Sequence, residues 1–170
     1  MPSRHAIFLN GPIGAGKTVL GRLAAAELGA SFIDSDDLGD PSKPWFGQVL
    51  SKARTLVGAG MAALRERPVV LVAMPLRDRD WAFFKARFEA EGVIVHCITL
   101  AANAEAILGP GRDREFSAHE QARIEEMIAQ GYARRSFSDV IVETAHASLA
   151  ATAEAVVAAC QDLMAGKPRD

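Results

Sequence analysis

A glycine-rich segment near the amino terminus carries the clearest chemical pattern in this sequence. Residues 11–18 read Gly-Pro-Ile-Gly-Ala-Gly-Lys-Thr and fit G-x-x-x-x-G-K-[ST]. Glycine adopts backbone conformations that other residues resist, so successive N–H groups can turn inward around a polyphosphate. In this pattern Lys17 reaches the outer phosphates and the Thr18 hydroxyl binds Mg²⁺. The segment therefore predicts a nucleotide-binding loop with contacts from Gly11, Gly14, Ala15, Gly16, Lys17, Thr18 and Val19.

Carboxylates follow the second apolar run of the chain. Residues 32–37 read Phe-Ile-Asp-Ser-Asp-Asp, and open α/β sheets bind ligands where their parallel strands end. In phosphoryl transfer such groups orient the metal and accept the proton of the attacking hydroxyl. Asp and Ser are also frequent in turns and caps, so a purely structural role is the alternative. Because the third apolar run ends without an acidic residue, we expect the metal role to fall on Asp34, but the residues alone do not decide between Asp34 and Asp36.

Arginines in a short breaker-rich segment are candidates for stabilising phosphoryl charge. Residues 109–117 hold Arg112 and Arg114 among glycines and a proline, a composition typical of a lid that closes over an active site. A cation there would neutralise the transferred group and help exclude water. A solvated loop with local ion pairs is the alternative. The sequence does not distinguish Arg112 from Arg114, and we predict a catalytic role for this pair.

A second set of arginines can hold an anionic acceptor. Arg134 and Arg135 follow a predicted helix and precede the last apolar run; they either anchor a substrate with their planar guanidinium groups or complement the helix end. Arg54, in a long helical pattern, is a weaker candidate for substrate binding, as are Arg77 and Arg79 after the third run.

Alternating apolar runs and helical patterns must position these residues. This alternation predicts an α/β domain with a mainly parallel sheet between helices. Glycines at 58 and 60 can interrupt the second helix, Gly29 is a helix stop signal, and Ser117 with Glu120 predicts a capping box. The five expected strands are 5–10, 31–34, 68–74, 93–100 and 139–143.

Composition narrows the function further. The 170 residues carry a net charge of −2, which gives no support for a nucleic-acid partner. No apolar run reaches membrane length and no leader pattern precedes the first strand, so we expect a cytoplasmic protein without a membrane partner.

Cys97 and Cys160 lie in apolar patterns without metal-ligand spacing and read as reduced core residues. The four histidines are scattered, and we expect them to be structural or solvent-facing. The chain length favours a single domain over residues 1–170.

Residues 11–18, followed by Gly-Arg-Leu-Ala at 21–24 and Phe-Ile-Asp-Ser-Asp at 32–36, resemble the shikimate kinase family of P-loop small-molecule kinases. The resemblance implies a three-layer α/β P-loop kinase fold with a five-stranded parallel sheet in the order 2-3-1-4-5. It also implies ATP with Mg²⁺, Asp34 near the metal and Asp36 at the acceptor hydroxyl. Residues of about 36–66 would form the acceptor side and residues of about 109–117 a short lid. A more diffuse likeness in residues 123–132 is to kinases related to chloramphenicol phosphotransferases.

These observations predict an ATP- and Mg²⁺-dependent kinase that transfers the γ-phosphoryl group to a hydroxyl of a small molecule. Two alternatives stay open at this stage. One is a nucleoside or nucleotide kinase, and the other is a non-catalytic ATP-binding switch protein. The identity of the acceptor and the oligomeric state do not follow from the sequence.

Overall fold

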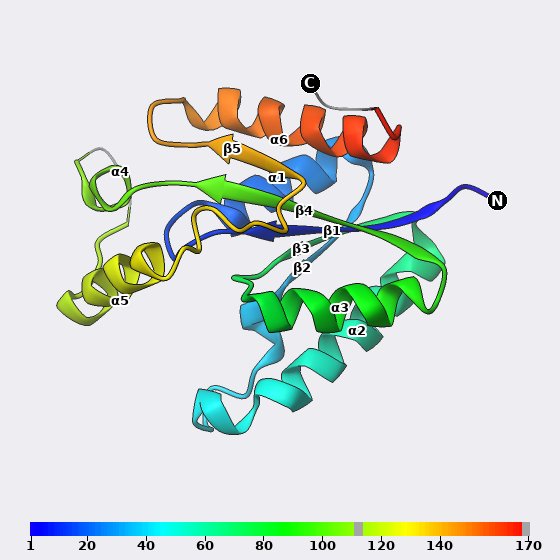
Figure 1. The fold of residues 1–170 in the computed structure, drawn as a ribbon, viewed down its shortest axis with the longest axis horizontal. Helices are drawn as coiled ribbons and strands as arrows, with labels where there is room; N and C mark the ends of the chain where they lie inside the picture. Colours follow the sequence, from blue (N-terminus) through cyan, green and yellow to red (C-terminus); the bar gives the residue numbers. More distant parts are fainter. Residues whose placement is uncertain (111–113, 168–170) are drawn as a thin grey trace.

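A computed structural model describes residues 1–110 and 114–167 of the chain. Five parallel strands form one sheet in the order β2-β3-β1-β4-β5 (Figure 1). The predicted strand order is therefore confirmed. The strands are β1 (Arg4–Asn10), β2 (Ser31–Asp34), β3 (Val69–Ala73), β4 (Val93–Ala101) and β5 (Val140–Glu143).

The central strands are apolar without interruption because helices cover both faces of the sheet. In β1, every residue after Arg4 is buried. Its register against β4 pairs Asn10 with Thr99, and its register against β3 pairs Leu9 with Ala73. Strands β1, β3 and β2 consequently end near one another, where the glycine-rich loop and Asp34 leave the sheet.

Helices form an outer layer on each face (Figure 1). Helices α1 and α6 pack on one face, and α2 and α3 pack on the other. Helices α4 and α5 lie beyond the carboxyl ends of the strands, on the side where the glycine-rich loop turns. The α-helices are α1 (Lys17–Leu28), α2 (Val49–Glu66), α3 (Asp78–Glu89), α4 (Ala104–Leu108), α5 (Ala118–Ala129) and α6 (Leu149–Met164). Two short 3-10 helices, η1 (Ser35–Leu38) and η2 (Trp45–Gly47), follow β2.

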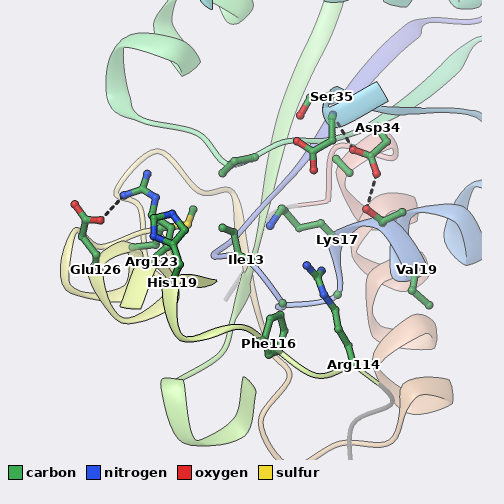
Figure 2. A pocket seen from close by; sticks show the side chains of 17 residues that line it. Ile13, Lys17, Val19, Asp34, Ser35, Arg114, Phe116, His119, Arg123 and Glu126 are labelled. Carbon is green, nitrogen blue, oxygen red and sulfur yellow. Dashed lines mark hydrogen bonds and ion pairs between the residues drawn. The ribbon is translucent and has the colours of Figure 1, made fainter. Parts of the chain in front are cut away.

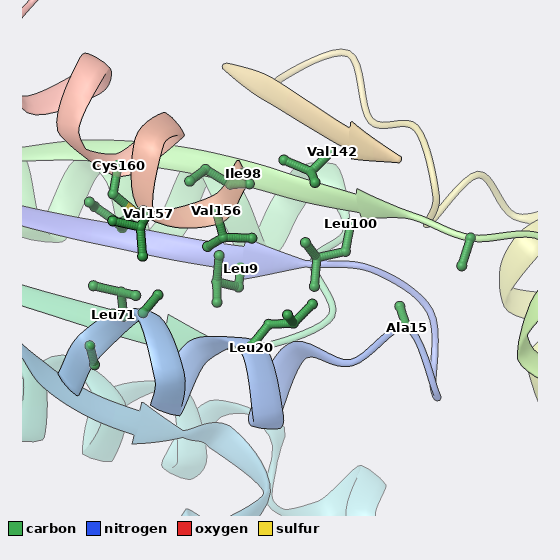
Figure 3. Close-up of a cluster of buried hydrophobic side chains, with 14 of the residues drawn as sticks. Leu9, Ala15, Leu20, Leu71, Ile98, Leu100, Val142, Val156, Val157 and Cys160 are labelled. Atoms are coloured by element: carbon green, nitrogen blue, oxygen red, sulfur yellow. The ribbon is translucent and has the colours of Figure 1, made fainter. Parts of the chain in front are cut away.

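The sheet separates two apolar cores. Figure 3 shows the core under α1 and α6, where Leu9, Leu20 and Val156 meet. The other core, under α2 and α3, is built around Phe8 and Phe84, whose ring centroids lie 5.3 Å apart. Alternate side chains of one strand point to opposite faces, so neighbours such as Phe8 and Leu9 serve different cores.

Several local expectations are confirmed, and two details differ from the sequence pattern. Gly29 ends α1 in the left-handed conformation, and Ser117 and Glu120 form the capping box of α5. Helix α2 runs without a break through Gly58 and Gly60. Helix α4 precedes the predicted lid segment and was not expected. No helix in the described parts of the chain combines the length and apolarity that crossing a bilayer requires.

Candidate active site

The glycine-rich loop joins β1 to α1 and presents backbone donors to a cavity. Gly14 and Gly16 have φ angles of 79° and 96°, in the left-handed region that favours glycine. Gly16 is the N-cap of α1 and has no side chain with which to cap it. The amides of the first helical turn therefore remain available to an anion, which the positive end of the helix dipole also attracts.

Lys17 folds back over this loop. Its ammonium donates to the carbonyl oxygens of Gly11 at 2.9 Å and Pro12 at 2.8 Å. Burial lowers the pKa of Lys17 from 10.5 to about 8, and the nearby carboxylates of Asp36 and Asp34 oppose that shift. The loop thus holds a partly desolvated cation at the place where a phosphate would need one. In Figure 2 Lys17 lies between Asp34 on one side and Arg114 on the other.

Asp34 connects the loop to the end of β2. The Thr18 hydroxyl donates to Asp34 Oδ2 at 2.6 Å, and the Asp36 amide donates to Asp34 Oδ1 at 3.0 Å (Figure 2). Asp34 is therefore the side-chain cap of η1 as well as the partner of Thr18. The two residues predicted to bind the metal, Thr18 and Asp34, therefore lie together. Asp34 also has the capping role that the sequence offered as the structural alternative.

Two cavities open at this end of the sheet. The first, about 990 Å³, is lined by the glycine-rich loop, the end of β2 and α5. The second, about 780 Å³, lies between η1, α2 and the start of α3. Asp36, Pro75 and Arg123 line both cavities. These residues mark the place where a molecule in one cavity can meet a molecule in the other.

Of the two lid candidates, Arg114 lines the first cavity (Figure 2). Its guanidinium donates to Glu120 at 2.9 Å and its central carbon lies 4.8 Å from the centroid of the Phe116 ring. Arg112 lies outside the described residues. Phe116 and Ile107 also pack against Gly14, so this part of the chain covers the phosphate loop.

Three of the arginines expected at the acceptor, Arg54, Arg134 and Arg135, lie elsewhere. Arg54 is exposed on α2 and lines neither cavity. Arg134 is exposed and hydrogen-bonds to Glu143 at the end of β5. Arg135 donates through Nε to the carbonyl oxygen of Leu76 at 3.0 Å, and likewise lines neither cavity. Their roles in substrate binding remain predictions, to which the cavity linings add no support.

Other basic residues occupy the position that these arginines were expected to fill. Lys52 of α2 lines the second cavity, with its ammonium 3.9 Å from Asp36. Arg77 and Arg79, which the sequence offered as weaker candidates, line the same cavity, and Arg123 lines both. Sequence reasoning missed Lys52 and gave Arg123 no role. A usable signal is the i, i+4 spacing of His119 and Arg123, which places both on one face of α5 (Figure 2).

Comparisons with known proteins agree with this geometry. The shikimate kinase of Halorhodospira halophila is 31% identical over 169 residues, covering 94% of each chain. Among solved structures, a gluconokinase from Sinorhizobium meliloti aligns with a TM-score of 0.69 and 17% identity, over 98% of this chain and 97% of that one. The shikimate kinase of Acinetobacter baumannii in complex with shikimate aligns with a TM-score of 0.59 and 20% identity, over 98% and 96%. No protein family model matches the chain.

Fold, phosphate loop and similar proteins together define a P-loop small-molecule kinase with a hydroxyl group as the acceptor. The nearly full-length similarity to a curated relative above 30% identity carries the assignment further. The chain belongs to the shikimate kinase family.

Proposed function

We propose that this kinase uses ATP with Mg²⁺ and transfers the γ-phosphoryl group to a hydroxyl of a small acidic molecule. The observation that carries the proposal is the junction of the two cavities. One contains the phosphate loop, the other is free to hold an acceptor, and the Asp36 carboxylate lines both. Phosphoryl transfer requires this arrangement because donor and acceptor must meet in line.

The side chains support a direct transfer. The acceptor hydroxyl gives its proton to the Asp36 carboxylate as its oxygen forms a bond to the γ-phosphorus. The bond between that phosphorus and the bridging oxygen breaks, and its electron pair leaves with ADP. Lys17, Arg114 and Arg123 surround the first cavity and stabilise charge on the moving group.

Magnesium fits the residues beside the phosphate loop. Thr18 and Asp34 offer a hydroxyl and a carboxylate oxygen that already lie 2.6 Å apart, and Mg²⁺ in kinases binds one or two such ligands together with phosphate oxygens. These two residues would hold the ion, which neutralises phosphate charge when bound.

Charge in the second cavity favours an acidic acceptor. Lys43, Lys52, Arg77, Arg79 and Arg123 line it. Asp40, Asp36 and Asp80 pair with the first three of these cations. The Lys43–Asp40 pair is exposed and therefore weak, so a substrate carboxylate can replace the protein carboxylate there at low cost, whereas Asp80 also caps α3 and stays bound to Arg77. Relatives named for shikimate and gluconate kinase activity make hydroxy acids the first compounds to test.

Acceptor-dependent ADP formation tests the proposal. Purified protein with Mg²⁺ and ATP is assayed against shikimate, gluconate, further hydroxy acids and nucleosides. We expect a hydroxy acid to stimulate turnover, and Asp36→Asn to lower kcat by roughly 10²- to 10⁴-fold, because proton transfer in the transition state is lost. Calorimetry should show that ATP still binds, since Asp36 is not in the phosphate loop.

Asp78→Asn, an exposed carboxylate in the first turn of α3 outside both cavity linings, is the matched control. It should retain full activity. Stimulation by nucleosides alone would instead identify a nucleoside kinase. ATP binding without stimulation by any compound would refute a kinase and favour the switch protein.

A further inference from the structure

Asn10 is a completely buried polar residue at the last position of β1, directly before the phosphate loop. Its Oδ1 accepts from the Leu76 amide at 2.7 Å. Its Nδ2 donates to Thr99 Oγ1 at 3.1 Å and to the Tyr132 carbonyl oxygen at 3.2 Å. One side chain therefore ties the start of the phosphate loop to the segments after β3, in β4 and after α5.

The Leu76 peptide group is held from a second direction. Asn10 accepts a hydrogen bond from the Leu76 N–H, and Arg135 Nε donates to the Leu76 carbonyl oxygen at 3.0 Å. Arg135 also donates through Nη1 to the Gln130 carbonyl oxygen at 2.9 Å, and its guanidinium carbon lies 4.3 Å from the Tyr132 ring centroid. A guanidinium group can make these directed contacts together because it is planar and forked.

Residues 74–77 contribute to the wall of the second cavity, which gives these contacts a functional meaning. Pro75 lines both cavities, while Met74 and Arg77 line the second. Tyr132, whose backbone bonds Asn10, lines the second cavity too. The hydrogen bonds of Asn10 and Arg135 thus set where this acceptor wall lies relative to the first residue of the phosphate loop.

We infer that Asn10 and Arg135 are positioning residues that lock the acceptor wall, residues 74–77, to the phosphate loop. The inference rests on the proposed function in one respect, that the two cavities hold donor and acceptor. Neither side chain lines a cavity, so both act through the Leu76 peptide. Misplacing reacting groups by about 1 Å can lower a rate by about 10²-fold, so a loosened wall should affect transfer more than nucleotide binding.

Hydrogen exchange tests the lock without any acceptor. Asn10→Ala and Arg135→Lys should each speed amide exchange in residues 74–77 by at least about fivefold, the loss expected when a hydrogen bond worth about 1 kcal/mol is removed. Lysine keeps the charge of Arg135 but lacks the fork that reaches two carbonyl oxygens. Arg22→Lys is the matched control, because Arg22 also lies over an aromatic ring, Phe32, but is an exposed residue of α1 outside both cavities.

Unchanged exchange in residues 74–77 of well-folded Arg135→Lys would overturn the inference, whatever the behaviour of Asn10→Ala, which removes a fully buried group and can lower stability. General acceleration across the sheet in both variants would also overturn it. That result would show that these residues merely stabilise the fold.

Kinetics supply the second measurement, with shikimate and gluconate as acceptor probes. For each variant we expect kcat for the accepted probe to fall about 10- to 100-fold, while the ATP dissociation constant changes less than about twofold. Acceptor-independent ATP hydrolysis should persist, because an attacking water molecule does not depend on the acceptor wall for its position. Equal losses of hydrolysis and transfer would overturn the positioning role. If neither probe is accepted, the proposed hydroxy-acid specificity fails, and the exchange measurement still decides the inference.

Discussion

The Lys17 ammonium bonds to the same loop that we expect to bind the nucleotide phosphates. Its two hydrogen bonds go to carbonyl oxygens of the loop itself, and burial lowers its pKa to about 8. A bound triphosphate would place negative charge beside the ammonium and raise that pKa again. Nucleotide binding and protonation of Lys17 are therefore linked, and each favours the other.

ATP binding should take up protons above pH 8. Free protein has then lost much of the Lys17 proton, and the complex regains it, so affinity falls as pH rises through 8. Calorimetry at about pH 9 in buffers of different ionisation enthalpy should show an uptake approaching about one proton. Lys17→Met should abolish the uptake and weaken binding.

Lys85→Met is the control for this measurement, because Lys85 pairs with Glu89 on the surface of α3. The proton uptake of Lys85→Met on ATP binding should equal that of the parent protein. Proton release on binding, or uptake that survives Lys17→Met, would contradict the linkage.

At the scale of elements, a close approach of two helices shapes the acceptor side. Helix α2 brings Lys52 to the second cavity and packs against α3 through Gly60. A Cβ at Gly60 would lie 2.7 Å from Phe88 Cζ, and the Phe88 ring is fully buried. Gly58, two residues earlier in the same helix, has open space around it. Glycine is therefore required for packing at one position and only tolerated at the other.

Alanine at these two positions should have opposite effects on stability. Gly58→Ala should stabilise the protein by about 0.5–1 kcal/mol, because alanine favours helix without a steric penalty. Gly60→Ala gains the same propensity but overpacks the Phe88 ring, which typically costs about 1–3 kcal/mol, so the net effect should be destabilising. Urea unfolding of both variants measures the difference. Equal stabilisation by both would show that α2 and α3 separate easily.

At the scale of the whole molecule, the sheet places the two thiols in different cores. Cys97 belongs to the core under α2 and α3, and Cys160 to the core under α1 and α6. Both are free and fully buried, as the sequence predicted. Burial raises the pKa of each thiol to about 12. Because the thiolate is the reactive form, neither should react in the folded state.

Thiol labelling should consequently report opening of the entire domain. In the parent protein each thiol should react only as fast as the protein unfolds, so the two thiols should be labelled at the same rate if unfolding is two-state. Saturating ATP should slow both reactions equally, because it binds the folded form. Faster labelling of one thiol would show that one core opens independently.

The sequence by itself determined the parts that depend on short-range chemistry. The loop from Gly11 to Thr18 was predictable because residue types at fixed spacing dictate its backbone. The five strands followed from apolar runs, and the ends of α1 and α5 followed from Gly29 and Ser117. Family resemblance added the strand order, which local patterns do not encode.

Only the tertiary structure decided which distant residues meet. Arg134 and Arg135 are adjacent in sequence, yet one pairs with Glu143 at the surface and the other holds the Leu76 peptide. Likewise Asn10 contacts Leu76, 66 residues away, and Tyr132, 122 residues away. Side chains of one type are interchangeable in a pattern, whereas their roles depend on the direction in which a packed strand or helix presents them. That direction is set by contacts between segments far apart in the chain.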